Sequence, residues 1–86
     1  MLIAKVVGSV VATQKEVSLV GKKLMIIQPM KSTGEFIGTE EIAVDDVGAG
    51  VGENVIVTKG GSARYLYGGN STIDSAIIGI IDSFEK

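Results

Sequence analysis

The chain is 86 residues long, 45% of them hydrophobic, and carries eight basic and ten acidic side chains for a formal net charge of −2. It has no histidine and no cysteine, so neither a disulfide nor a histidine–cysteine zinc site can reinforce the fold. The slightly acidic balance argues against a nucleic-acid-binding surface, which requires clustered lysine and arginine. This length predicts one domain, residues 1–86, with a small core of its own.

The N-terminal segment is apolar but is neither a signal peptide nor a membrane span. It lacks a basic start, and Lys5, Gly8 and Ser9 interrupt its apolar run. A spanning helix needs about 18–20 continuous apolar residues. We therefore expect a soluble, intracellular protein with no membrane partner, and the absence of cysteine fits a reducing cytoplasm.

Short runs rich in valine and isoleucine recur along the chain, separated by glycine or polar turns. Such runs predict strands, and they cover residues 2–13, 23–29, 36–44, 54–58 and 76–84. One short helix is expected at residues 62–66. No other segment has a helical period long enough to connect parallel strands, so the sheet should be mainly antiparallel. The sequence predicts an all-β fold, a small five-stranded, partly open barrel of the OB type.

Several predicted strands are apolar on both faces. A barrel strand whose outer face meets water alternates apolar and polar residues, because successive side chains point to opposite sides. Continuous apolar runs break that alternation at Val6–Val7, Val10–Val11, Leu24–Ile27, Val55–Val57, Ile77–Ile78 and Ile80–Ile81. One set of side chains can fill the barrel, and the other set needs a second partner. Covering about 400 Å² of it per subunit would contribute roughly 10 kcal/mol before entropic costs. The pattern therefore predicts an obligate oligomer.

A glycine-rich segment follows the third predicted strand. Gly48, Ala49, Gly50 and Gly52 remove most side-chain bulk there, as at turns with positive φ or at close approaches of another backbone. A dinucleotide fingerprint would need G-x-G-x-x-G at the start of a helix within a βαβ unit. The observed spacing is G-x-G-x-G before a β-rich run, so a structural turn at a subunit interface is the favoured interpretation.

The segment Gly60-Gly61-Ser62-Ala63-Arg64 allows two interpretations. Its backbone N–H groups and Arg64 could hold an anion. Alternatively, Ser62 could cap a helical turn while Arg64 pairs with a carboxylate of a neighbouring subunit. Candidate acceptors are Asp45, Asp46 and Asp74. The structural interpretation is favoured, without a choice among these acceptors.

No catalytic, cofactor or metal site is predicted. Asp45, Asp46 and Glu53 lack the spacing of a calcium loop, and adjacent aspartates beside glycines are ordinary turn residues. Serines and threonines lie at turns or strand ends without an evident general base. Tyr65 and Tyr67 raise one alternative function, an OB-fold module that binds single-stranded nucleic acid on aromatic platforms. The basic cluster Lys22-Lys23 is more simply interpreted as a solvated hairpin end.

Three segments carry a resemblance to a known family. They are "VGSVVATQKEVSLVGKKLMIIQP" at 7–29, "AVDDVGAGVGENVIVTKGGSAR" at 43–64 and "IDSAIIGIID" at 73–82. Together they resemble the EutN/CcmL family of bacterial microcompartment vertex proteins, from about Leu2 to Asp82. The family's usual Gly-Ser-Ser-Ala-Arg is Gly60-Gly61-Ser62-Ala63-Arg64 here.

The resemblance implies a non-enzymatic structural protein. It would form a homo-pentamer of OB-like barrels in the shell of a cytoplasmic bacterial microcompartment, cap the shell vertices and contact hexameric shell proteins. The residues expected at the oligomer interface are Val47, Gly48, Ala49, Gly50, Gly52, Gly61, Ser62, Ala63 and Arg64.

Overall fold

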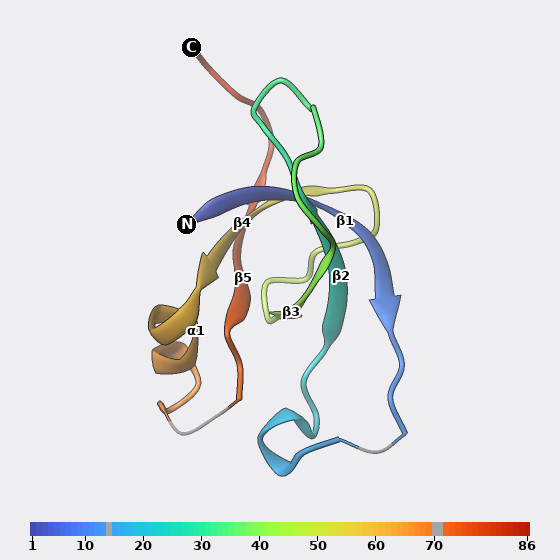
Figure 1. Ribbon diagram of the computed structural model, residues 1–86, viewed down its shortest axis with the longest axis vertical. Coiled ribbons are helices and arrows are strands. Elements are labelled where there is room, and N and C mark those ends of the chain that lie inside the picture. The colour runs from blue at the N-terminus through green and yellow to red at the C-terminus, as the bar shows by residue number, and fades with distance from the viewer. Residues whose placement is uncertain (14, 70–71) are drawn as a thin grey trace.

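The computed structural model describes residues 1–13, 15–69 and 72–86, which form a small β-barrel with one short α-helix (Figure 1). The elements in chain order are β1 (Leu2–Val10), the 3-10 helix η1 (Val17–Leu19), β2 (Leu24–Pro29), β3 (Glu41–Asp45), β4 (Asn54–Lys59), α1 (Gly60–Leu66) and β5 (Ser75–Ile81). Strands and turns dominate, so the all-β prediction with one short helix is confirmed.

The strands close into a barrel in the order β1-β2-β3-β5-β4, with β4 returning to β1. Four of the five pairings are antiparallel, as predicted. The fifth, between β3 and β5, is parallel and aligns Val44 with Ala76. It is possible because β4 and α1 lie between these strands in the chain and bring it back in the same direction. The expectation of a partly open barrel was wrong, because this parallel pairing closes it.

One set of alternating side chains fills the barrel. Its interior holds buried residues from all five strands and one loop residue: Ala4, Val6, Met25, Ile27, Ala43, Val55, Val57, Ile77 and Ala49. A second cluster lies outside the sheet, where α1 and η1 cover it: Leu24, Val44, Ala63, Ile73 and Ala76, with Val10, Leu19 and Tyr67 packed against them. The first cluster takes the inward side chains of the strands, and the second takes some of the outward ones.

The predicted strand ends were too generous at three places. β1 ends at Val10 rather than at residue 13, and β5 ends at Ile81 rather than at residue 84. The predicted strand 36–44 begins only at Glu41. Residues 31–40 form a projecting hairpin in which Gly34 and Gly38 have φ of 93° and 71°, conformations that interrupt a strand. Phe36 contributes one isolated bridge to Met30.

Other apolar side chains of the strands point outward and stay exposed. Val7, Ile42, Ile78 and Ile80 are 36–53% exposed. The interpretation that these strands are apolar on both faces is therefore confirmed. No helix in the described part of the chain is both long and apolar enough to cross a membrane.

Candidate subunit interface

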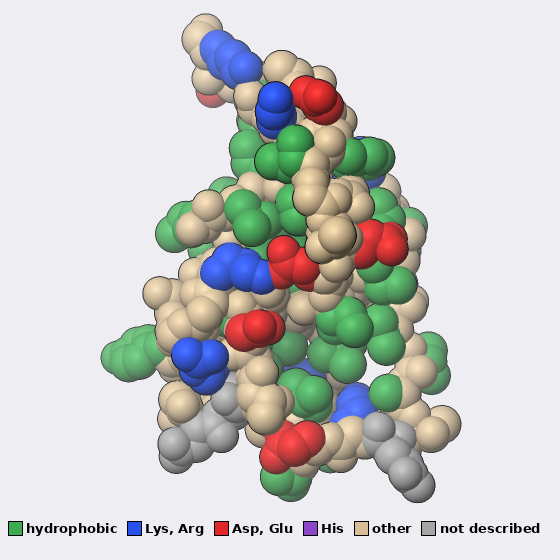
Figure 2. Space-filling model, viewed as in Figure 1, with side chains coloured by type: hydrophobic (Ala, Val, Ile, Leu, Met, Phe, Trp, Pro, Cys, Tyr) green, Lys and Arg blue, Asp and Glu red, His purple; other side chains and the backbone are tan. Residues whose placement is uncertain are grey.

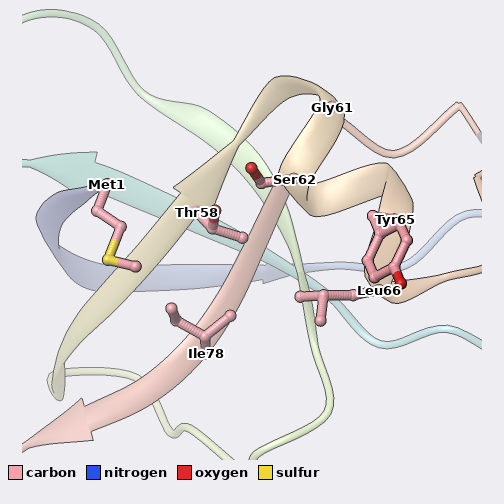
Figure 3. Close-up of a pocket in the computed structure, with 7 residues that line it drawn as sticks. All are labelled: Met1, Thr58, Gly61, Ser62, Tyr65, Leu66 and Ile78. Atoms are coloured by element: carbon pink, nitrogen blue, oxygen red, sulfur yellow. The ribbon is translucent and has the colours of Figure 1, made fainter.

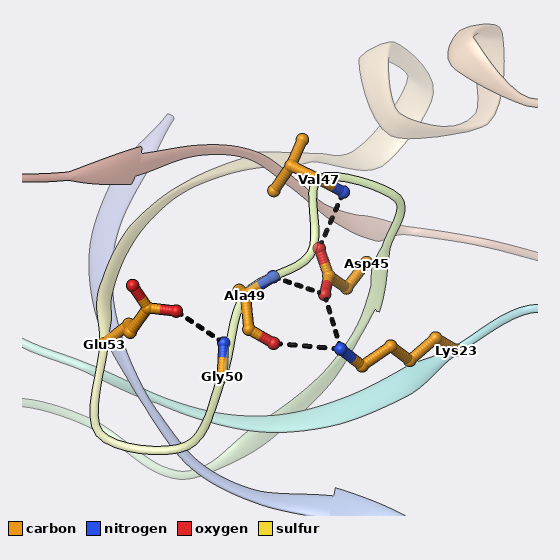
Figure 4. Close-up of polar contacts among 6 residues, drawn as sticks. All are labelled: Lys23, Asp45, Val47, Ala49, Gly50 and Glu53. Atoms are coloured by element: carbon orange, nitrogen blue, oxygen red, sulfur yellow. Dashed lines mark hydrogen bonds and ion pairs between the residues drawn. The ribbon is translucent and has the colours of Figure 1, made fainter.

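The loop of residues 46–53, here called the glycine loop, is anchored by a buried carboxylate at the end of β3. Asp45 Oδ1 accepts a hydrogen bond from Val47 N at 2.9 Å, and Oδ2 accepts one from Ala49 N at 2.8 Å (Figure 4). Lys23 Nζ lies 3.2 Å from Asp45 Oδ2 and donates to Ala49 O at 3.0 Å. The carboxylate is fully buried, so these charge-assisted bonds offset its desolvation.

These bonds turn Ala49 toward the barrel interior. Its side chain is 0% exposed and packs in the barrel core. The second half of the loop is held to β1, because Gly52 N donates to Val6 O at 2.7 Å and Val6 N donates to Glu53 O at 2.9 Å. The glycine loop therefore folds over one end of the barrel, with Ala49 as its inward residue.

The glycines of this loop have two different physical roles. Gly48 and Gly52 have φ of 84° and 95°, which side chains rarely tolerate, so the turn itself requires glycine there. Gly50 has no such φ; its N–H donates to Glu53 Oε1 at 2.7 Å, and a Cβ would lie 3.4 Å from that oxygen. The turn does not require glycine at position 50.

Helix α1 begins two residues before the predicted start. Its N-cap is Lys59, which makes no side-chain capping bond, so the expectation that Ser62 is the N-cap was wrong. Ser62 is exposed in the first turn, and Gly60 makes the turn out of β4 with φ of 61°. Ala63 is fully buried in the second cluster. Its methyl group fixes the helix to its own barrel.

Arg64 has no ion-pair partner among the described residues of its own subunit. Of the candidate acceptors, Asp45 is occupied by Lys23, and Asp46 hydrogen-bonds Tyr67. Asp74 contributes its backbone carbonyl to Gly60 N at 2.7 Å. None of the three candidate acceptors forms an ion pair with Arg64 in the described part of the chain.

Three of the predicted interface residues, Val47, Gly61 and Ser62, line two neighbouring hollows of one surface. Val47 of the glycine loop shares a hollow of about 320 Å³ with Leu66 and Ile78. Gly61 and Ser62 line a second hollow of about 580 Å³ that includes the same leucine and isoleucine (Figure 3). We call this continuous area the α1–β5 surface; its exposed apolar side chains are Met1, Val47, Tyr65, Leu66 and Ile78.

Sequence reasoning missed a second apolar area, over β2 and β3. The β2–β3 hollow, about 540 Å³ in volume, is lined by Val10, Ile26, Ile42, Glu40, Glu41 and Asp74. Glu41 is neutralised by Lys59, which also donates to Ser75 Oγ at 2.6 Å. The signal was present in the outward parity of the apolar runs, but sequence alone does not show which outward side chains gather on one face.

Tyr67 joins the end of α1 to the glycine loop. Burial raises the pKa of its hydroxyl to about 12, and the hydrogen bond to Asp46 with the nearby negative charge adds to the effect. Lys22 Nζ lies 5.3 Å from the centre of the tyrosine ring, within range of a cation–π contact. The predicted basic cluster is thus engaged within the subunit: Lys22 contacts Tyr67 and Lys23 contacts Asp45.

In the part of the chain that the structure describes, no group of three or more acidic side chains is placed to hold a metal ion. The groups that converge on the glycine loop bind one another, and each serves to hold the loop in shape. The chemistry of this region is therefore hydrogen bonding and apolar contact.

These features define a small closed β-barrel with apolar side chains on its outside as well as its inside. The family model described as "Ethanolamine utilisation protein EutN/carboxysome" matches residues 1–82. The chain belongs to this EutN/CcmL family.

Two curated relatives span almost the same length. The bacterial microcompartment shell vertex protein PduN of Salmonella typhimurium is 47% identical, over 96% of this chain and 97% of the relative. The carboxysome shell vertex protein CcmL of Thermosynechococcus vestitus is 42% identical, over 100% of this chain and 88% of the relative.

Solved structures share the fold. CcmL of Nostoc sp. PCC 7120 superposes with a TM-score of 0.91 and 41% identity, covering 99% of this chain and 93% of that one. GrpN, a pentameric microcompartment shell protein from Rhodospirillum rubrum, superposes with a TM-score of 0.90 and 43% identity, covering 100% and 99%. The chain is thus similar along its length to microcompartment and carboxysome shell proteins.

Proposed function

We propose that this chain is a structural, non-enzymatic subunit that forms pentamers at the vertices of a bacterial microcompartment shell. The relatives that it matches along its length are named shell vertex proteins, and one of the similar structures is described as pentameric. The structural observation that carries the proposal is the second, outward set of apolar side chains. A barrel that functions alone gains nothing from exposing it.

The mechanism is geometric. A flat layer of hexagonal tiles cannot close on itself, and five-fold units at the corners introduce the curvature that closure needs. Each subunit presents one face to one neighbour and a different face to the other neighbour, a heterologous contact that closes when the rotation completes a ring. The rim of the ring contacts hexameric shell proteins, and the assembled shell lies in the cytoplasm.

The seam between subunits includes the glycine loop and the outer side of α1. The residues that we assign to contact with the neighbour are Val47, Gly48, Gly50, Gly52, Gly61, Ser62 and Arg64. Ala49 and Ala63 act from within their own subunit, because the buried methyl group of Ala49 packs in the barrel core and that of Ala63 packs in the second cluster. The lack of side-chain bulk in the glycine loop lets a neighbouring subunit approach its backbone closely.

The alternative function, binding of single-stranded nucleic acid, finds no support in the geometry. An aromatic platform needs exposed rings above a basic groove. The ring of Tyr67 is occupied by its own helix end and by Lys22, and Lys23 pairs with Asp45. Tyr65 is exposed, but Tyr67 is packed within its own subunit, so the two tyrosines do not form a shared platform for bases.

Native mass spectrometry of the purified chain tests the proposal. We expect a species with five times the chain mass, and we expect it to persist at high salt because apolar contacts are strengthened rather than screened. Co-expression with hexameric shell proteins should then give closed shells, whereas omission of this chain should leave shells open at their corners. A chain that stays monomeric at high concentration and does not enter such shells would overturn the proposal.

A further inference from the structure

A short segment crosses one end of the barrel with few contacts. Residues 16–20, here called the η1 strap, contain the 3-10 helix η1 and lie at the end opposite the projecting hairpin of residues 31–40 (Figure 1). All three residues of η1 are described, and none of them is fully buried. Val17 and Val20 are 81% and 64% exposed, and Figure 2 shows further apolar side chains at the surface of this end. The strap is therefore held by only a few of its side chains.

Leu19 is the apolar anchor of the η1 strap. It packs against the second cluster but is itself only half-buried. A hollow of about 250 Å³ remains beside it, lined also by Leu24, Val44 and Ile73 of that cluster. A side chain that borders a hollow lacks partner atoms on that side and gains less dispersion energy. This anchor is therefore weaker than a contact in the barrel core.

Ser18 is the polar anchor of the η1 strap. Its hydroxyl donates to Glu16 Oε2, which also accepts a hydrogen bond from Ser18 N at 2.9 Å. Because the hydroxyl has one proton and gives it to this carboxylate, Ser18 Oγ accepts from Thr72, whose N and Oγ1 lie 3.3 Å and 3.4 Å away. These bonds are long and exposed, so they hold the strap weakly.

Lys22 is tied to the η1 strap by its backbone. Lys22 N donates to Leu19 O at 3.0 Å, across a turn at Gly21, which has a φ of 80°. The ammonium group of Lys22 lies 5.3 Å from the centre of the Tyr67 ring, and Tyr67 packs on the same cluster as Leu19. Leu19 and Lys22 therefore both support Tyr67, the first through the cluster and the second at the aromatic ring.

Tyr67 connects this support to α1 and to the glycine loop. It is the C-cap of α1, and its N–H donates to Arg64 O at 3.0 Å. Its hydroxyl bonds Asp46 in the glycine loop. A displacement of the strap therefore reaches both segments through one side chain.

We propose that the η1 strap is a conformational switch within the subunit. With the strap closed, Leu19 and Lys22 hold Tyr67, and α1 and the glycine loop keep the positions described above. Release of the strap removes both contacts together, so the end of α1 and the glycine loop open more often. Because the contacts of the strap are weak and those of the barrel core are not, the switch opens locally while the barrel stays folded.

The absence of cysteine allows the strap to be locked by one disulfide. In the chain carrying Ser18→Cys and Thr72→Cys, oxidation should replace the contact between two side-chain oxygens that lie 3.4 Å apart. We expect hydrogen exchange of the amides of Tyr67 and Ala49 to become about threefold slower, or more, than after reduction of the same chain. The amides of β1 that pair with β4 report unfolding of the whole barrel, and they should slow less.

Both redox forms are compared at one protein concentration, and native mass spectrometry checks that their assembly state is the same. Slower exchange that is confined to the strap would overturn the switch. Slowing at Tyr67 and Ala49 that only equals the slowing in β1 would also overturn it, because the disulfide would then act on the whole barrel.

Leu19→Ala tests the switch without a disulfide. It removes most of the apolar anchor, so exchange at Tyr67 and Ala49 should become about tenfold faster, with a smaller change in β1. Val17→Ala is the matched control, because Val17 lies in the same 3-10 helix with its side chain 81% exposed. It should leave exchange unchanged. Equal acceleration by the two variants, or acceleration by Leu19→Ala that is as large in β1, would contradict the proposal.

The switch also predicts how readily subunits assemble, and this step rests on the proposed pentamer. Since α1 and the glycine loop are the segments assigned to the seam, a subunit with an open strap is less competent to join a ring. Leu19→Ala should raise the concentration at which rings form by about threefold or more, and the oxidised disulfide between positions 18 and 72 should reverse this effect. Native mass spectrometry over a dilution series measures both.

The two proposals fail in different ways. Rings that form equally well with and without Leu19→Ala would overturn the role of the strap in assembly and leave the pentamer standing. A wild-type chain that forms no ring would overturn the proposed function, whereas hydrogen exchange would still decide whether the strap controls Tyr67.

Discussion

At the scale of single residues, a buried acid and two glycines, Gly48 and Gly52, set the shape of the glycine loop. Asp45 gathers two backbone N–H groups and one ammonium, which fixes where the loop leaves β3. Gly48 and Gly52 provide backbone conformations that other residues resist. Gly50 provides neither service. Its lack of a side chain fits the proposed close approach of a neighbouring subunit to the glycine loop.

Replacement of Gly50 by valine tests this explanation. We expect Gly50→Val to impair ring formation strongly while costing the barrel less than about 1 kcal/mol of unfolding free energy, because φ at Gly50 is not left-handed and a Cβ would meet only the Glu53 carboxylate, at 3.4 Å. Native mass spectrometry reports the ring, and urea unfolding reports the barrel. An intact ring of unchanged mass would count against placing the loop at the interface.

Gly48→Val is the matched control, because it changes the same residue type two positions away. A β-branched side chain at a φ of 84° strains the backbone, so we expect it to destabilise the barrel itself by about 1–3 kcal/mol. Comparison of the two variants distinguishes a glycine required for folding of the barrel from one required for contact between subunits.

At the scale of elements, the end of α1 is joined to the glycine loop through one tyrosine. Tyr67 packs on the second cluster, bonds Asp46 and lies under Lys22. Three segments distant in sequence therefore meet at the side chain of Tyr67. This contact holds α1 in the position from which Tyr65 and Leu66 face outward.

This contact makes stability depend on alkaline pH. The folded-state pKa of Tyr67, about 12, lies above its ordinary value of 10.0, so the unfolded chain loses this proton first. Its contribution is therefore complete below about pH 10 and is lost as the pH rises toward 12. We expect urea unfolding to show a steeper fall in stability over that range for the wild type than for Tyr67→Phe. Tyr65→Phe, at an exposed position, should behave as the wild type does; equal slopes for all three chains would contradict the assignment.

The strands could be predicted from sequence because their apolar runs are long, but their ends could not. The predicted strand at residues 36–44 extended into the hairpin because Phe36 and Ile37 are residue types common in strands. The left-handed conformation of Gly38, which interrupts the strand, cannot be predicted from the apolar pattern. Helix α1 begins at Gly60 rather than at the predicted residue 62, because Gly60 makes the turn directly after β4. The 3-10 helix at Val17–Leu19 was not predicted, since three residues carry no period.

At the scale of the whole molecule, the doubled apolar pattern was visible in sequence, whereas its arrangement was not. Parity separates inward from outward side chains on each strand. Which outward side chains meet depends on strand order, and that order includes a parallel pair that the pattern did not indicate. The inward turn of Ala49 likewise depends on hydrogen bonds to Asp45, which only the folded loop reveals.

Association and folding should therefore be coupled in this protein. Unfolding of a ring that must also dissociate depends on subunit concentration, so we expect the midpoint of thermal unfolding to rise with chain concentration. Ile78→Asp places a charge on the α1–β5 surface, where burial against a neighbour becomes costly. We expect this variant to be a folded monomer whose midpoint does not change on dilution. Differential scanning calorimetry over a wide range of concentrations is the measurement, and a wild-type midpoint that never moves would contradict the coupling.

Closure of the barrel has a consequence for how copies can meet. Each of the five described strands has hydrogen-bonded neighbours on both sides, so most of its backbone N–H and C=O groups are already paired. Another polypeptide cannot easily lengthen this sheet by adding a strand, which is the usual route to runaway fibre growth. A free subunit therefore exposes apolar side chains but no unpaired strand edge, so growth of fibres by strand addition is disfavoured before it assembles.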